Sequence, residues 1–144
     1  MKVTLMLADA AQVADGKLYI LGGGWSAIVP GGPFAVAGKI EVPYDRATET
    51  HEWRLELVDA DGQPVLVHPA LDAEPQPLVL SGSFSTGIPP HVVPGTPLDS
   101  VIAANFAPGL PLAPSSRYQW RFSIDGQENE DWSLGFSTRP APAS

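Results

Sequence analysis

The stretch Tyr118-Gln119-Trp120-Arg121-Phe122-Ser123-Ile124-Asp125-Gly126 carries the clearest structural signal in the chain. Apolar and polar residues alternate through it, and a period of two is typical of a β-strand with one buried face. After the Asp-Gly pair the same alternation returns in Trp132-Ser133-Leu134-Gly135-Phe136. This pattern predicts a β-hairpin with a two-residue type I′ turn, because Gly reaches positive φ freely and Asp tolerates it.

Two further Asp-Gly pairs, Asp15-Gly16 and Asp61-Gly62, also separate alternating stretches and predict further hairpins. No window shows a helical repeat, and only Asp45–Glu49 tolerates a single helical turn. Strands with one polar face pack as two antiparallel sheets, so we expect an all-β, immunoglobulin-like sandwich of about nine short strands. The expected strands are Val3–Ala8, Lys17–Gly22, Phe34–Val42, Glu52–Val58, Pro64–Val67, Leu78–Ser85, Ser100–Phe106, Arg117–Ile124 and Asp131–Thr138.

Length and composition indicate one domain over residues 1–140 followed by a flexible tail over 141–144. A chain of 144 residues with 44% hydrophobic residues buries a core without help from metals or disulfides. Its sixteen prolines gather in the connections between the expected strands. Some of them have the P-x-x-P spacing of polyproline ligands, although rigid crossovers between sheets produce the same composition.

Net charge and cysteine content restrict the function. Eight Lys and Arg residues against sixteen Asp and Glu residues give a formal charge of −8, which repels nucleic acid and anionic membranes. The absence of cysteine excludes thiol catalysis, Cys-ligated zinc, iron–sulfur clusters and disulfides. Asp9 interrupts the apolar N-terminus too early for a signal peptide, and no segment has membrane-spanning length, so we expect a cytoplasmic protein.

Two motifs resemble ligand loops but lack the residues that such loops need. Gly22–Gly24 suggests a phosphate loop, yet no Lys-Ser or Lys-Thr follows, and Trp25 leads to prolines instead of a helix. Asp59–Gly62 suggests the start of a calcium loop, but its twelfth position is Ala70 where a bidentate Glu is required. We interpret the first as a strand end that another segment approaches closely, and the second as a turn.

The three histidines, His51, His68 and His91, lie at long and irregular spacings beside turn and proline signals. None forms an i, i+4 pair, and none has a serine or carboxylate placed for nucleophile activation. We therefore interpret them as exposed loop residues and predict no catalytic residue, no metal and no cofactor. An enzyme would have to draw on Asp9, Asp15, His51 and His68, which no spacing connects.

The first hairpin is apolar on both faces. Its expected inward set is Leu5, Leu7, Leu18 and Ile20, and the opposite face carries Met6, Tyr19 and Leu21. A strand that is apolar on both sides is normally buried on both sides. Either a loop such as Val29–Pro33 covers this hairpin, or its outer face meets another subunit.

Three segments carry a resemblance to a known family: Leu7-Ala8-Asp9-Ala10-Ala11-Gln12, residues 16–25 and residues 51–59. They resemble an uncharacterised bacterial family of small cytoplasmic β-sandwich proteins, abundant in actinobacteria, whose members open with "ADAAQ…GKLYILGGGW". The closing strand Tyr118-Gln119-Trp120-Arg121-Phe122 resembles that family as well. The resemblance implies one cytoplasmic sandwich domain, and it brings no activity or site residue with it.

These observations favour a non-enzymatic interaction or assembly module that associates with a protein partner, including a second copy of itself. The expected interface is Met6, Tyr19 and Leu21. The alternative is a sandwich that binds a small molecule or carbohydrate through exposed aromatic rings. Trp25 and Tyr44 are its candidate ligand contacts, because the other tryptophans fall on expected core faces.

Overall fold

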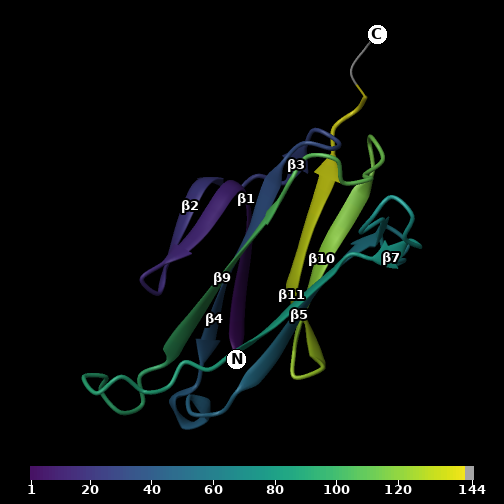
Figure 1. Ribbon diagram of the computed structural model, residues 1–144. Helices are drawn as coiled ribbons and strands as arrows, with labels where there is room; N and C mark the ends of the chain where they lie inside the picture. Colours follow the sequence, from purple (N-terminus) through teal and green to yellow (C-terminus); the bar gives the residue numbers. More distant parts are fainter. Residues whose placement is uncertain (142–144) are drawn as a thin grey trace.

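The computed structural model describes residues 1–141 and is all-β apart from one 3-10 turn at Tyr44–Arg46 (Figure 1). Of the expected flexible tail, residues 142–144 lie outside the described residues. The described strands are β1 (Lys2–Ala14), β2 (Lys17–Gly23), β3 (Ala27–Ile28), β4 (Phe34–Val42), β5 (His51–Asp59), β6 (Leu66–Val67), β7 (Gln76–Pro77), β8 (Val79–Phe84), β9 (Leu98–Phe106), β10 (Arg117–Ile124) and β11 (Gln127–Thr138). The all-β expectation is confirmed. No helix within residues 1–141 has the length and apolar composition needed to cross a membrane.

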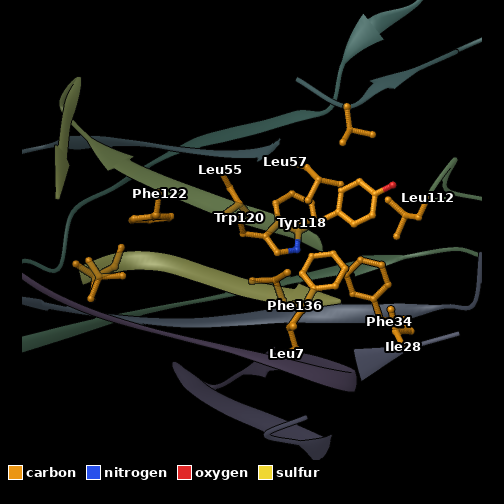
Figure 2. Close-up of a cluster of buried hydrophobic side chains, with 14 of the residues drawn as sticks. Leu7, Ile28, Phe34, Leu55, Leu57, Leu112, Tyr118, Trp120, Phe122 and Phe136 are labelled. Atoms are coloured by element: carbon orange, nitrogen blue, oxygen red, sulfur yellow. The ribbon is translucent and has the colours of Figure 1, made fainter. Parts of the chain in front are cut away.

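Two main sheets enclose the core. Sheet A has the strand order β2-β1-β4-β9, sheet B has the order β3-β11-β10-β5-β8, and β6 and β7 form a separate pair. All neighbouring strands run antiparallel except β3 and β11, which are parallel. Aromatic rings join the sheets. The Trp120 ring of sheet B lies 6.4 Å from the ring of Phe34 of sheet A (Figure 2), and it lies 5.1 Å from the ring of Phe106, also of sheet A.

The alternation along β10 is confirmed. Tyr118, Trp120, Phe122 and Ile124 are buried, whereas Arg117 and Arg121 are exposed. Trp120 is fully buried, and Phe122 stacks on Trp53 with ring centroids 6.0 Å apart. β10 therefore contributes one apolar face to the core, where the hydrophobic effect stabilises its burial.

The Asp-Gly turns differ from one another. Asp15-Gly16 and Asp125-Gly126 have positive φ at both positions, 51° and 69° in the first pair and 51° and 76° in the second. These values confirm the predicted type I′ turns. At Asp61-Gly62 the prediction is wrong, because only Gly62 has a positive φ, 77°. The Asp59 carboxylate accepts hydrogen bonds of 2.9 Å from two backbone N–H groups further along the chain, and this side-chain cap sets a different turn.

The largest departure from expectation is a strong bend in β1. Residues 2–8 of β1 pair with β4, and residues 8–14 pair with β2. The second half of β1 and the whole of β2 fold back across the face of sheet A that points away from sheet B. In Figure 1 this purple hairpin lies on the left, so that hairpin, sheet A and sheet B follow one another as three layers. We call residues 9–23 the folded-back hairpin.

Polar and apolar contacts both hold the folded-back hairpin on sheet A. Asn105 of β9 binds the backbone of Ala11 twice: Ala11 N–H donates to Oδ1 at 3.1 Å, and Nδ2 donates to the Ala11 carbonyl at 2.8 Å. Ala11 also packs on Ala35 and Ala37, the outward-facing residues of β4, with Leu18 against the same cluster. The second face of β4 is buried in this way without a partner chain.

These contacts correct two expectations about the first hairpin. One expectation is that a loop such as Val29–Pro33 covers the hairpin, but the hairpin buries its inner face against sheet A itself, and Val29 is exposed. Leu18 joins the small outer cluster, and Ile20 is 40% exposed, so neither belongs to the main core. The reason is geometric, since alternation continues through a bend and does not reveal that a strand has left its sheet.

Candidate functional site

The three residues of the expected interface, Met6, Tyr19 and Leu21, do not lie together. Tyr19 and Leu21, two residues apart on β2, share one face of the strand and are 54% and 70% exposed. Met6 lies elsewhere, on the part of β1 within sheet A. A Cβ added at Gly23 would lie 2.9 Å from Met6 Sδ and 2.7 Å from Ile20 Cγ2, so these two side chains meet beside Gly23. The structure thus brings Tyr19 and Leu21 together and separates Met6 from them.

β2 is the end strand of sheet A and pairs with β1 on one side. Its centre, Leu18-Tyr19-Ile20-Leu21, is a run of four apolar residues. Natural edge strands are normally protected by prolines, bulges or charges along their length. In β2 the only charged residue is Lys17 at its start. The outer edge of β2 therefore offers backbone donors and acceptors beside large apolar side chains.

The glycine run after β2 fixes where the hairpin ends. Gly22 has a φ of 61°, and a Cβ added there would collide with the side chain of Asp9. The Asp9 carboxylate in turn accepts a 3.2 Å hydrogen bond from the indole Nε1 of Trp25, and Gly24 N–H donates to the Leu7 carbonyl at 2.9 Å. These contacts confirm the interpretation of the glycines as a strand end that another segment approaches closely.

The segment that contains the hairpin has no net charge, although the protein is acidic. Residues 1–24 contain two lysines and two aspartates, which cancel, whereas the whole chain carries −8. Charge repulsion between two copies is therefore reduced when they approach through residues 1–24.

The two aromatic candidates for ligand contact do not form one site. The Trp25 ring packs edge-on against Phe34 at the start of β4, with centroids 6.2 Å apart. Tyr44 follows the far end of β4 and lines a shallow hollow of about 580 Å³ together with Met1, Pro43 and Pro97. A strand of nine residues separates the two rings. No single ligand of carbohydrate size spans that length, which is roughly 30 Å at 3.4 Å per residue.

His51 departs from the expected exposed loop position. It is 1% exposed, its Nδ1 lies 2.8 Å from Asp125 Oδ2, and its Nε2 lies 3.3 Å from the Arg46 carbonyl oxygen. The other oxygen of Asp125 accepts a 2.9 Å hydrogen bond from Glu52 N–H. Mainly because of the hydrogen bond with His51, and further through the bond from Glu52, the pKa of Asp125 lies below its ordinary value of 3.8. This His51–Asp125 pair joins the start of β5 to the last hairpin turn.

The four residues that an enzyme would need contact different partners. Asp9 binds Trp25, and Asp15 occupies the tip of the first hairpin. His51 binds Asp125, whereas the Nδ1 of His68 lies 3.3 Å from the Ala73 carbonyl oxygen. The third histidine, His91, is exposed as expected. Within the part of the chain that the structure describes, no group of three His, Cys, Asp or Glu residues has metal-binding geometry. The His51–Asp125 pair escaped sequence reasoning because 74 residues separate its members.

Comparison with known proteins places the chain in a family. Residues 3–136 match the model of a family of unknown function (DUF6941), and the chain belongs to that family. No curated protein and no solved structure matches the chain. The resemblance to an uncharacterised family is confirmed in this respect, and the match assigns no activity.

Proposed function

We propose that this member of a family of unknown function is a non-enzymatic interaction module that self-associates through the free edge of β2. The observation that carries the proposal is the apolar run Leu18–Leu21 on an end strand, with Tyr19 and Leu21 more than half exposed. An exposed strand edge pairs readily with another strand, since backbone hydrogen bonds supply affinity and flanking side chains supply specificity.

The sequence of β2 suits pairing with a second copy. An antiparallel pair centred on Ile20 places Tyr19 opposite Leu21 of the second copy, and the two-fold axis repeats this contact. Aromatic and aliphatic residues that face each other across strands stabilise a sheet. The same register sets Lys17 opposite Gly23, so no like charges meet. The neutral charge of residues 1–24 supports a second copy over a strongly charged partner.

We extend the proposal to an immunoglobulin-like topology. Three features support it: two sheets that share one core, the parallel pairing of β3 with β11, and a hydrogen bond from Ala113 N–H to the Tyr118 hydroxyl oxygen at 2.7 Å. The last resembles the tyrosine corner of such domains, in which a tyrosine near the start of a late strand binds the backbone a few residues upstream.

We also propose a cytoplasmic location in bacteria, chiefly actinobacteria, and a protein partner instead of nucleic acid or a membrane. The net charge of −8 supports this choice because it opposes binding to phosphate backbones and anionic lipids. The resemblance of the opening segment to small cytoplasmic bacterial proteins supports the location.

Sedimentation velocity tests self-association directly. We expect the wild-type protein to form dimers at micromolar concentration, and Leu21→Asp to be monomeric with an unchanged circular dichroism spectrum, because an unpaired charge would be desolvated in the interface. Val93→Asp is the matched control, since Val93 is 71% exposed on a loop far from β2 in the chain. A wild-type protein that stays monomeric at several hundred micromolar would overturn the proposal.

A further inference from the structure

A cleft of about 460 Å³ lies on the face of sheet B that points away from the core. Residues of the central strands β10 and β11 line it, with Ser26 and the turn after β5 at its rim. Arg117, Gln119 and Arg121 share this face of β10 because the residues between them point into the core. The cleft is on the opposite side of the molecule from the folded-back hairpin.

Two cations face this cleft in a chain that has only eight Lys and Arg residues. Neither Arg117 nor Arg121 forms an ion pair with a carboxylate in the part of the molecule described, residues 1–141. Glu56 lies opposite Arg121 on β5, but its carboxylate pairs with Arg54 at 3.7 Å. Arg121 Nε donates to Gln119 Oε1 at 3.2 Å, which leaves the remaining guanidinium donors free.

Asp59 is the acidic residue on the lining of the cleft, and its one negative charge leaves a net positive charge against Arg117 and Arg121. The Asp59 Oδ1 also accepts hydrogen bonds from the N–H groups of Asp61 and Gln63, which hold this carboxylate in the turn. Guanidinium groups with free donors bind carboxylates and phosphates through charge-assisted, paired hydrogen bonds. The electrostatic character of the cleft therefore favours an anionic ligand.

Gly135 forms part of the cleft wall, directly opposite Gln119. Glycine in the interior of a strand is destabilising, and it often marks a place that a ligand approaches closely. Neither backbone conformation nor crowding explains Gly135: its φ is not positive, and a Cβ there would meet only the Tyr118 carbonyl oxygen, at 4.0 Å. What the missing side chain provides is open space between Gln119 and Ser137.

We infer that this cleft binds a small organic acid with two acidic groups and hydroxyls between them. Arg117 and Arg121 are four residues apart on one strand, so their backbones are separated by roughly 13 Å. Each guanidinium then receives one acidic group, while Gln119 and the Ser137 hydroxyl bond the central hydroxyls. Neutral sugars lack the charges that this arrangement recognises, and inorganic phosphate offers one acidic group where the cleft presents two cations.

Isothermal titration with tartrate tests this inference. We expect saturable binding that weakens about tenfold in Arg117→Gln and in Arg121→Gln, because each variant loses a charge-assisted pair. Lys39→Gln, which removes one cation from sheet A, is the matched control and should bind tartrate like the wild type. Absence of saturable binding, or binding by the two arginine variants that is as tight as that of the wild type, would overturn the inference, as would phosphate binding as tightly as tartrate.

A second variant separates a ligand role of Gly135 from a structural one. Gly135→Val should abolish tartrate binding by filling the cleft, and it should leave the thermal midpoint unchanged or higher, because valine suits a strand interior better than glycine. A lowered midpoint with retained binding would contradict the assignment. The self-association proposal is independent, since it rests on β2 and sheet A.

Discussion

The two hairpins closed by type I′ Asp-Gly turns, β1–β2 and β10–β11, have almost the same turn geometry and opposite environments. The first turn has φ values of 51° and 69°, and the second has 51° and 76°. β10 has neighbours on both sides and buries its apolar face in the main core, whereas β2 has one neighbour and exposes Tyr19 and Leu21. Turn chemistry is therefore local, while burial depends on the sheet that a hairpin joins.

The turn aspartates show the same contrast. Asp125 accepts a hydrogen bond from Glu52 N–H and lies within hydrogen-bond distance of buried His51, so its turn is tied to β5. For Asp15 no side-chain hydrogen bond is found over residues 1–141. One hairpin is thus fixed at both its strands and its turn, and the other keeps a free tip and a free edge. Segments of the second kind are available for binding because they are not needed for the core.

The largest predicted effect comes from truncating matched aromatic residues in the two hairpins. Trp120→Ala should destabilise the protein by about 3–5 kcal/mol, as large-to-small changes of buried aromatic residues do. Tyr19→Ala should change the stability of the monomer by no more than about 0.5 kcal/mol, as is usual at the surface. Urea denaturation of both variants at low protein concentration measures the two values. An unchanged urea midpoint for Trp120→Ala would rule out the assignment of Trp120 to the buried face of β10.

Substitution of the turn glycines should have a smaller effect. Gly126→Val should destabilise by more than about 1 kcal/mol, because a β-branched residue does not tolerate the φ of 76° found there. Glu128→Ala, two residues away on the exposed start of β11, should be close to neutral. Equal midpoints for these two variants in urea would contradict the type I′ assignment.

The next prediction concerns the two turn aspartates, whose substitution should change the free energy of unfolding by an amount that depends on pH. Asp125→Asn should cost about 1 kcal/mol at neutral pH, because a charge-assisted hydrogen bond to His51 becomes a neutral one, whereas Asp15→Asn should be nearly silent. The folded-state pKa of Asp125 lies below its ordinary value of 3.8. Its stabilising contribution is therefore present above that value and is lost as the pH falls further.

Denaturation midpoints from pH 7 down to pH 2 check this sign. The gap between the wild type and Asp125→Asn should shrink when the pH falls below the unfolded value of 3.8, because the carboxyl group then becomes protonated. A gap that does not shrink between pH 4 and pH 2, or one of the same size for Asp15→Asn, would show that Asp125 is not the anchoring carboxylate.

Local alternation predicts most of the sheet framework. Phe34–Val42 and Arg117–Ile124 have the expected bounds because their period-two pattern is uninterrupted. β3 and β7 contain two residues each, which is too short to show any period. The bend of β1 is also invisible in the pattern, because a strand that leaves its sheet keeps its alternation.

The sites are less predictable than the strands because they depend on register and long-range pairing. Tyr19 and Leu21 are correctly placed on one face, but only the strand order shows that β2 is an edge. The arginine cleft depends on the register that sets Gly135 opposite Gln119, and no local spacing contains that information. Sequence reasoning thus points to Tyr19 and Leu21 but assigns no role to the arginines of the cleft, and in both sites only the fold supplies the neighbours.

Hydrogen exchange along β2 is the most direct measurement of the central claim, that the free edge of this strand pairs with a second copy. We expect the amides that point away from β1, between Lys17 and Gly23, to become protected as the protein concentration rises, because their N–H groups then bond to the second copy. Amides of β10, bonded on both sides within one chain, should show no such change. Exchange along β2 that stays fast and independent of concentration would contradict the claim.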